Sequence, residues 1–511
     1  MTRRLLDPSA SRPVMSRETA IDLGKRLLDQ VRTYNQGVSI EHTATAVTRL
    51  ANGSILDMDD GAQIRVSFGS ACGEWMPIAI KTNQIGDALF DSLLSHIKTM
   101  APSPPPPPKG TDVSDDPVDQ AKSTYGPRTF PKVSLWHEST AVAMQRARAD
   151  AIPALIEQLR ASNLRSAATV GLVARSVLHL YHWGLVAFSD ETDCEVTVTA
   201  RTSDGTGSGW GGVAHRDWSR CTPSVAAERA ISIAKQSQHP VALEPGRRTV
   251  ILGPAAVAQL VYQMAELFDG QSATDPWGAS DPRSGTPFTY RKADGTGRLN
   301  NLGLHVFDRR LMMTSDPADP DGGFAPFFNA GGKFDTVDGF PLPAITWIDR
   351  GVLTNLAWGT DAIDRRVLPA DWPYAMRVFA APGTQTSTVD EMIANCDDGV
   401  YVNRLSSVSV LLGERGTGMM TGVTRDGCFY VKHGKIERPI KNFQFIESPF
   451  LAFNRIEAIG TPERVPFGIN APTTMMQKGL YGRQPRWPRP PMIVPPLMIR
   501  DFNFSALSDA V

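Results

Sequence analysis

Residues 249–271 read TVILGPAAVAQLVYQMAELFDGQ, and this stretch shows the clearest structural pattern in the chain. It opens with four residues typical of a strand, and Gly253-Pro254 marks a turn. Apolar residues then recur at three- and four-residue spacing without an internal glycine or proline, which predicts a helix over residues 255–268. Asp269-Gly270 ends it. We therefore expect a strand, a tight turn and an amphipathic helix, in that order.

The predicted helix is poor in metal ligands. No histidine occurs between His239 and His305, and the helix offers Tyr262, Gln263 and Glu266 instead. A zinc hydrolase needs about three protein ligands from His, Glu, Asp or Cys and an open position for water. This helix cannot supply a pair of histidine ligands.

Length and composition limit the classes of protein. The chain has 511 residues, and about 150 residues per domain is a useful prior, so we expect two large domains, over residues 1–240 and 241–511. A formal net charge of -1 means that the chain as a whole does not attract nucleic acid or an acidic membrane electrostatically. The sequence has no apolar run of about 18 residues and no apolar segment after its first arginines. We expect no nucleic-acid partner, no membrane span and a cytoplasmic location.

The number and spacing of the cysteines also favour a cytoplasmic protein. Five cysteines are widely spaced without a CxxC pair, which argues against a disulfide framework and a cysteine-rich zinc site. We expect buried, reduced thiols.

The first half of the chain predicts a mixture of helices and strands. Ser16 is a suitable N-cap, and Asn52-Gly53 and Asp59-Asp60-Gly61 are turn signals. The proline-rich residues 101–119 predict an exposed loop, with a PxxP ligand as the alternative. The expected helices are 18–32, 85–100, 142–162 with a break at Pro153, and 223–236; the expected strands are 38–49, 54–56, 63–68, 167–176, 177–183, 185–189 and 194–202.

The second half predicts mainly strands with short turns. Residues 204–213, DGTGSGWGGV, superficially suggest a phosphate loop, but they follow a polar strand and lack GK[ST]. Ser387 or Thr388, with Glu391 close behind, predicts a capped helix over 388–394. The remaining expectations are a long loop over 273–297, a hairpin of 342–346 with 352–358, a pairing of 400–410 with 418–424, a proline-dense segment over 482–496, and a last strand over 497–504.

Several carboxy-terminal segments together resemble one known family. Residues 421–449 read TGVTRDGCFYVKHGKIERPIKNFQFIESP, which predicts strands separated by an Arg-Asp-Gly turn and a His-Gly-Lys turn. The companion segments are GFPLPAITWIDRGVLTNL at 339–356, DDGVYVNRL at 397–405 and NRIEAIG at 454–460. With GTGSGWGG and the strand-helix of 249–270, this series resembles the TldD/PmbA family over nearly the whole chain.

The resemblance implies a two-domain α+β fold, with an amino-terminal sheet and helices and a mostly β carboxy-terminal domain. It also implies a cytoplasmic TldD/TldE metalloprotease acting on unfolded or leader peptides held in extended form. In that family the TldD-type subunit holds zinc through an HExxxH helix and a later cysteine. This sequence lacks both histidines, and no cysteine follows Cys428.

The chain thus resembles the TldE/PmbA-type subunit, which has no zinc of its own and would pair with a zinc-bearing TldD-type homologue. Two alternatives remain open at this point. One is a homodimeric relative performing non-hydrolytic chemistry in a biosynthetic pathway. The other is a peptide-binding regulator without chemistry.

The candidate substrate-binding residues are Arg404, Arg425, Asp426 and Gly427. The alternative for Arg425-Asp426 is a turn with a solvent-exposed ion pair, which contributes little to stability.

Two histidine patterns are weaker candidates. His137-Glu138 lacks a second histidine four residues after the first, because residue 142 is valine. His179 and His182 would point to opposite faces of the strand expected there, so we expect no metal site at either pattern.

Overall fold

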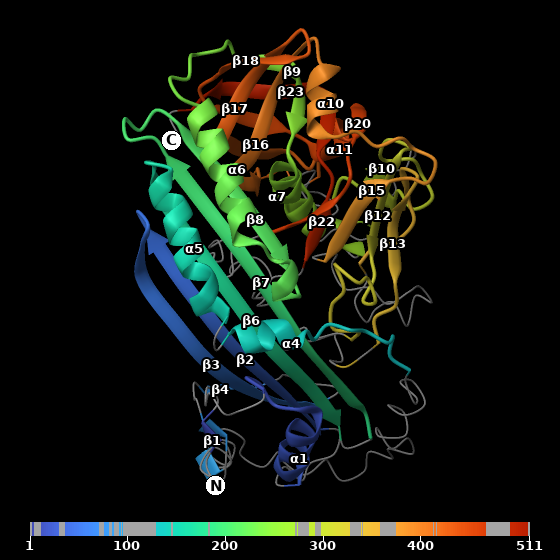
Figure 1. Cartoon of the computed structure of the whole chain (residues 1–511). Coiled ribbons are helices and arrows are strands. Elements are labelled where there is room, and N and C mark those ends of the chain that lie inside the picture. The colour runs from blue at the N-terminus through green and yellow to red at the C-terminus, as the bar shows by residue number, and fades with distance from the viewer. Residues whose placement is uncertain are drawn as a thin grey trace.

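The protein is a mixture of α-helices and β-sheets, as the sequence predicts (Figure 1). The computed structural model describes residues 3–4, 12–29, 36–70, 76–80, 84–85, 91–92, 95, 129–144, 147–181, 184–270, 273, 286–291, 298–327, 339, 341–357, 375–411, 413–414, 416–466 and 491–508. The expected helix 85–100, the proline-rich segment 101–119 and the loop 273–297 lie largely outside these residues, as does most of the segment 482–496. None of the described helices is both long and apolar enough to cross a membrane.

The amino-terminal part is built on one antiparallel sheet of long strands, which run diagonally across Figure 1. Its strand order is β4-β3-β2-β6-β7-β8. The bounds are β2 Gln36–Ala51, β3 Ser54–Ser70, β4 Met76–Ile80, β6 Arg165–Tyr181, β7 Val186–Arg201 and β8 Ser208–His215. A separate pair joins β1 (Arg3–Arg4) to β5 (Gln84–Ile85).

These strands are longer than the sequence predicts. Asp59-Asp60-Gly61 is not a turn, because each of the three residues pairs with β2 inside the continuous strand β3. The four strands expected over 167–202 are likewise only two, β6 and β7, which pair without a shift from Arg165 to Leu180. Pairing with neighbours far along the chain overrides a local turn signal.

Helices cover one face of this sheet. Residues of alternate strand positions, such as Ala44 and Ala46, point to this face and pack beneath α5 and α6, while Val38 and Ile40 pack beneath α1. Ser16 caps α1 through a bond from the Thr19 N–H, as expected. The helical bounds are α1 Arg17–Leu28, α4 Glu138–Ala143, α5 Ala147–Ala161, η1 Trp218–Arg220 and α6 Pro223–Gln236.

The break expected at Pro153 lies elsewhere. Pro153 is inside α5, and the change of direction falls between α4 and α5. Three apolar side chains of α5 are buried against the sheet, and this packing offsets the backbone hydrogen bond that proline removes. They are Ile152, Leu155 and Leu159.

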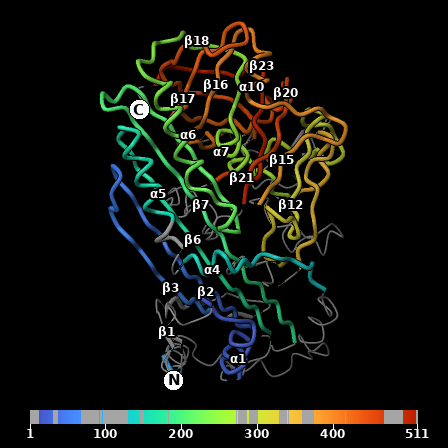
Figure 2. The backbone as a smooth tube through the Cα atoms, in the orientation of Figure 1, coloured from blue at the N-terminus to red at the C-terminus, as the bar shows by residue number. Residues whose placement is uncertain are grey.

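The carboxy-terminal part contains a sheet that closes on itself. Strand β17 pairs with β19 and also with β16, so the path β16-β9-β23-β19-β17 returns to its start; β16 and β17 lie side by side in Figure 2. Strands β18 and β20 attach outside this ring. The bounds are β9 Gly246–Leu252, β16 Asp398–Val410, β17 Met420–Lys432, β18 Lys435–Pro439, β19 Phe443–Glu447, β20 Ile456–Ile459 and β23 Leu497–Leu507.

A second sheet lies beside this ring in the order β14-β13-β12-β15-β22-β21. It contains the hairpin expected around Arg350-Gly351, and Thr388 and Glu391 form the expected capping box of α10. Its strand bounds are β12 Leu311–Ser315, β13 Ile345–Asp349, β14 Val352–Leu353, β15 Met376–Ala380, β21 Glu463–Val465 and β22 Met492–Val494. Strands β10 Thr289–Arg291 and β11 Arg298–Asn300 form a separate pair. The helices of this part are α7 Pro254–Met264, η2 Ala265–Phe268, α10 Val389–Ala394 and α11 Pro449–Ala452. The expected domain boundary near residue 240 stays a prediction.

The glycine run of residues 204–213 is a packing surface. Glycines 207, 209 and 211 face the backbone of α6, opposite its buried alanines 234, 230 and 226. A Cβ atom at Gly209 would lie 2.2 Å from the Ala230 carbonyl oxygen, and one at Gly211 would lie 2.2 Å from that of Ala226. Only glycine permits this approach of strand β8 to helix α6, so close packing explains the run without a phosphate ligand.

We expect Gly209→Ala to lower the free energy of unfolding by about 3 kcal/mol or more, because the new methyl group would meet the backbone of α6, and either α6 or β8 must move to admit it. Gly205→Ala is the matched control: Gly205 has a φ of +75° but nothing within 4 Å of its Cβ position. That variant should cost only about 1–2 kcal/mol of backbone strain. Urea unfolding measures both, and equal stability losses would contradict the packing explanation.

His42 is a buried ionisable group in this sheet. It lies on β2 with none of its surface exposed, and its Nδ1 accepts the Met15 N–H at 3.0 Å. The other ring nitrogen, Nε2, is buried with no hydrogen-bond partner among the residues that the structure describes. Burial lowers the pKa of His42 to about 3.

This pKa makes stability depend on pH. An exposed histidine in the unfolded chain has a pKa of about 6.5, so between about pH 6.5 and 3 the unfolded chain binds a proton that the folded chain does not. The contribution to stability is complete above this window and is lost as the pH falls, at up to about 1.4 kcal/mol per pH unit.

We therefore expect His42→Asn, which keeps an acceptor for the Met15 N–H, to reduce the loss of stability between about pH 7 and pH 5. Urea unfolding at both pH values provides the measurement. His239→Asn, at a histidine whose side chain is 75% exposed, should keep the wild-type slope. A His42→Asn protein with the wild-type slope would show that His42 is not the group responsible.

Candidate functional site

Helix α7 is an apolar helix in the centre of the carboxy-terminal core. All but three of its eleven residues are buried, and it packs against β9, β16, β21 and β22. The predicted helix is confirmed, although its last turn, η2, is a 3-10 helix. The same core contains the aromatic residue Phe268, whose ring contacts those of Phe288 and Trp347.

The donor set of this helix does not fit a zinc ion. Tyr262 is buried, Gln263 is a neutral amide, and the helix has no His, Cys or Asp. Across the residues that the structure describes, His, Cys, Asp and Glu form no group of three that could hold a metal. No chemical step can therefore be assigned to a zinc ion on α7.

Two of the cysteines have thiols that burial keeps protonated. Cys194, Cys221, Cys396 and Cys428 are buried and free, as expected, whereas Cys72 lies outside the described residues. Burial raises the pKa of Cys396 to about 11 and that of Cys428 to about 12. Because the thiolate is the nucleophile and the metal ligand, Cys396 and Cys428 are unreactive at neutral pH.

The residues Arg425-Asp426-Gly427 form a bulge, and the expected turn is wrong. They lie inside the continuous strand β17, where Asp426 and Gly427 together oppose the single residue Asn403 of β16. Both bulge residues have positive φ, 53° for Asp426 and 119° for Gly427. The extra residue turns the Asp426 side chain away from the regular alternation of the strand.

Asp426 is buried, which excludes the solvent-exposed ion pair as its description. Only 2% of its surface is exposed. The Ser208 hydroxyl donates a hydrogen bond of 2.6 Å to Asp426 Oδ1, and Oδ2 lies 3.5 Å from Arg404 Nη2 and 3.9 Å from Arg425 Nε. The bulge thus brings all four candidate residues together and joins them to β8 of the amino-terminal sheet.

Asn403 and Trp210 complete this cluster. The Asn403 side-chain amide donates to the main-chain oxygens of Trp210 and Asp426, at 3.1 and 3.0 Å. The Arg404 guanidinium lies 5.3 Å from the centre of the Trp210 ring, within the range of a cation–π contact. Burial lowers the pKa of Arg404, an effect that the neighbouring Asp426 opposes.

The guanidinium groups of the cluster can reach solvent. Two guanidinium groups share the carboxylate of Asp426, and 25% of the Arg404 side chain and 34% of the Arg425 side chain remain exposed. Guanidinium groups donate to carboxylates and carbonyl oxygens. This arrangement can bind the main chain or an acidic group of a peptide.

A second charged cluster was not predicted. It lies on the face of the amino-terminal sheet opposite the helices, where Arg175 contacts both Glu41, at 2.9 Å, and Glu191, at 3.3 Å. Arg216 lies 3.5 Å from Glu191, and Arg464 of β21 pairs with Asp193. The sign of this cluster in the sequence is that acidic residues occupy alternate positions along β7. Each named carboxylate has a cation as partner, which is typical of a structural junction.

The weaker histidine candidates do not form a metal site. His137 precedes α4 without a side-chain cap bond, and its Nδ1 lies 3.9 Å from Asp217. His179 is fully buried on β6, where its ring meets Phe327 edge to face. His182 lies outside the described residues.

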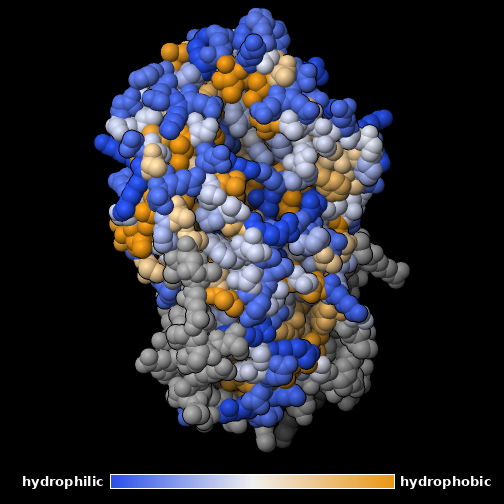
Figure 3. All heavy atoms as spheres, viewed as in Figure 1, coloured by the Kyte–Doolittle hydropathy of each residue, from blue (hydrophilic) through white to orange (hydrophobic). Residues whose placement is uncertain are grey.

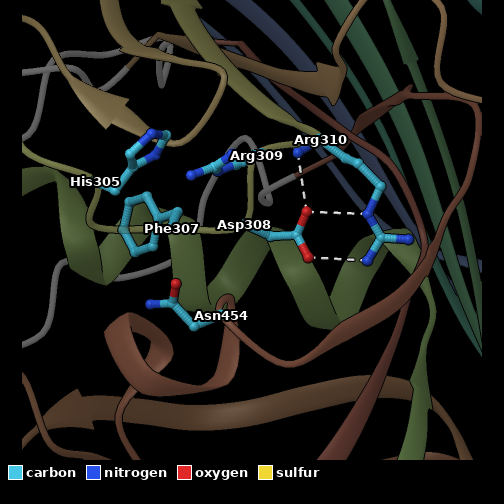
Figure 4. Close-up of a pocket in the computed structure, with 6 residues that line it drawn as sticks. All are labelled: His305, Phe307, Asp308, Arg309, Arg310 and Asn454. Atoms are coloured by element: carbon cyan, nitrogen blue, oxygen red, sulfur yellow. Dashed lines mark hydrogen bonds and ion pairs between the residues drawn. The ribbon is translucent and has the colours of Figure 1, made fainter.

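A surface pocket of about 460 Å³ lies between α11 and the loop before β12 (Figure 4). Its lining includes Asn454, from the segment NRIEAIG. Asp308 in this pocket accepts bonds from Arg310 at 2.9 and 2.8 Å. Burial would raise the pKa of Asp308, but the bonds from Arg310 lower it. The pocket is lined by His305, Phe307, Asp308, Arg309, Arg310 and Asn454.

The class of protein follows from the family model that the chain matches. Residues 245–505 match the PmbA/TldA metallopeptidase C-terminal domain, so this chain belongs to the PmbA/TldD family of metallopeptidase-related proteins. The match includes β9, α7 and the bulge of β17. No curated protein matches the sequence.

Solved structures extend the similarity to almost the whole chain. The chain is similar to TldE from Thermococcus kodakarensis, with a TM-score of 0.64, 13% identity and coverage of 95% of this chain and 99% of that one. It is also similar to a putative modulator of DNA gyrase from Bacteroides thetaiotaomicron, with a TM-score of 0.61, 14% identity and coverage of 94% of this chain and 98% of that one. A putative modulator of DNA gyrase from Thermotoga maritima gives a TM-score of 0.60, 14% identity and coverage of 94% of this chain and 100% of that one. At these identities the likeness shows a shared fold.

Proposed function

We propose that this chain is a TldE/PmbA-type subunit of a heterodimeric peptidase, in which a TldD-type homologue supplies the zinc ion. The observation that carries the proposal is the composition of α7. The chain belongs to a metallopeptidase-related family, yet this helix presents apolar side chains without a histidine. A subunit of this kind contributes substrate binding and needs a partner to activate water.

The substrate class in this proposal is an unfolded or leader peptide in extended form. An extended peptide can pair with a strand through its main chain, so recognition needs few specific side chains. The pair Arg404 and Arg425 supplies donors for carbonyl oxygens or for an acidic residue of such a peptide. Because Asp426 is bonded by Ser208, the guanidinium positions are tied to the junction of the two sheets.

The proposal places the complex in the cytoplasm. The four free, buried thiols are consistent with a reducing compartment.

The first test is reconstitution of activity. The purified chain should not cleave casein, and mixing it with an HExxxH-bearing homologue should give cleavage faster than that of the homologue alone. Cleavage by this chain alone at the rate of the mixture would overturn the proposal. So would a mixture that is no faster than the homologue.

The second part of the test addresses the arginines. Arg425→Gln should raise the KM of the mixture about tenfold, because a charge-assisted hydrogen bond to the substrate is lost. Arg438→Gln is the matched control, at an arginine of β18 whose side chain is 40% exposed and pairs with its neighbour Glu437. Equal KM values for the two variants would remove Arg425 from the substrate site.

A further inference from the structure

The surface pocket of about 460 Å³ beside α11 shares no lining residue with the cluster around Asp426. Its volume lies in the lower part of the range of about 300–1,000 Å³ that is typical of small-ligand sites. All six lining residues belong to the part of the chain that the structure describes. Figure 3 shows hydrophobic residues scattered among hydrophilic ones in the region of α11 and β12, which favours a small ligand over a broad apolar partner.

The floor of the pocket is apolar and held in place. The Phe307 ring stacks on Phe450, with ring centres 5.6 Å apart, and its centre lies 5.9 Å from that of Phe453. All three side chains are buried. The Asn454 side-chain nitrogen donates to the main-chain oxygens of Val306 and Phe450, at 2.7 and 2.9 Å. Because these walls are already fixed, they lose little conformational entropy when a ligand binds.

The charged and polar groups of the pocket divide into paired and unpaired ones. Arg310 donates to both carboxylate oxygens of Asp308, at 2.9 and 2.8 Å, and to two main-chain oxygens of β20. The charges of these two residues therefore balance each other. Arg309 and His305 are exposed, and neither side chain forms a hydrogen bond or ion pair with any residue that the structure describes. Their donors remain available to a ligand.

Figure 4 shows how these side chains surround the pocket. Arg309 and His305 lie above the Phe307 ring in this view, and the Asn454 side-chain oxygen points toward the ring from below. The nitrogen of Asn454 is used within the protein, so its oxygen is the atom that can accept a bond from a ligand. The pocket thus combines donors at one side, an apolar floor and one acceptor opposite the donors.

The unpaired charge selects the anion. A guanidinium group binds a carboxylate through two parallel hydrogen bonds, and an imidazole N–H can donate a further one. Arg309 is the one arginine among the described lining residues that has no carboxylate partner, and its charge balances the single charge of a carboxylate. A phosphate group would carry a charge of about -1.5 to -2 and stay only partly balanced.

We propose that this pocket binds the carboxylate of an N-acylated apolar amino acid, which is also the chemistry of the last residue of a peptide. Arg309 and His305 donate to the carboxylate, and the apolar side chain lies against the Phe307 ring. The Asn454 oxygen accepts from the amide N–H of the ligand. This site shares no residue with the arginine pair of β16 and β17, and it does not rest on the proposed peptidase role.

The probe is N-acetyl-phenylalanine, titrated into the full chain by isothermal calorimetry, and it should bind saturably. N-acetyl-phenylalanine amide lacks the carboxylate and should bind at least about tenfold more weakly. N-acetyl-glycine lacks the apolar side chain and should lose a similar factor. A longer peptide that ends in phenylalanine distinguishes the two sources of this chemistry. Affinity equal to that of the probe or higher indicates a peptide end, and affinity at least about tenfold lower indicates a free acid.

Variants at Arg309 locate the site. Arg309→Gln removes the charge and should weaken binding of the probe at least about tenfold. Arg309→Lys keeps the charge but loses the planar fork, so it should weaken binding less, by about threefold. Arg220→Gln is the matched control, at an arginine of η1 whose side chain is 62% exposed, and it should keep the wild-type affinity. Both positions are exposed, so circular dichroism should show folded proteins.

Three results would overturn the proposal. The first is no saturable binding of N-acetyl-phenylalanine by the wild-type chain. The second is equal affinity for the acid and its amide, because the carboxylate would then contribute nothing. The third is wild-type affinity in Arg309→Gln, because the bound acid would then lie elsewhere. These measurements use the chain without a partner or casein, so failure of this site and failure of the peptidase role are distinguishable.

Discussion

The close approach of β8 to α6 is the constraint on which the arrangement of the two sheets depends. Glycines 207, 209 and 211 remove the side chains that would hold the helix away, and the buried alanines of α6 meet them. This contact fixes β8 at the edge of the amino-terminal sheet. Ser208 and Trp210 of the same strand then reach the bulge of β17, where Ser208 donates to Asp426.

The bulge in β17 brings the candidate substrate-binding residues together beside this contact. Without the positive φ of Asp426 and Gly427, β17 would keep its regular alternation, and the Asp426 carboxylate would not lie between Ser208 and the two arginines. A Cβ atom at Gly427 would lie 2.6 Å from Ile233 of α6. Helix α6, which packs on β8, therefore also limits the size of the side chain that fits at Gly427. One helix therefore supports both sides of the junction.

Local signals in the sequence predicted local structure well. The caps of α1 and α10, the bounds of α6 and the hairpins at Arg350 and His433 were all correct, because neighbouring residues determine them. The long strands were divided too often, since Asp59-Asp60-Gly61 looks like a turn until β2 pairs with it.

The candidate site was only partly predictable. Its residues were identified from the family resemblance, but the bulge and the bond from Ser208 to Asp426 join positions 218 residues apart, which no local pattern reveals. The cation partners of Glu191 and Asp193 come from β6, the chain after β8, and β21, so this cluster also depends on the tertiary fold.

The functional account rests on helix α7. This helix buries eight of its eleven residues in the apolar core of the carboxy-terminal part, and it has no imidazole to give to a metal ion. Elemental analysis of the purified chain, after incubation with zinc and gel filtration, tests this directly. The account predicts far less than one zinc ion per chain. One zinc ion per chain, located beside α7 by anomalous X-ray scattering, would contradict it.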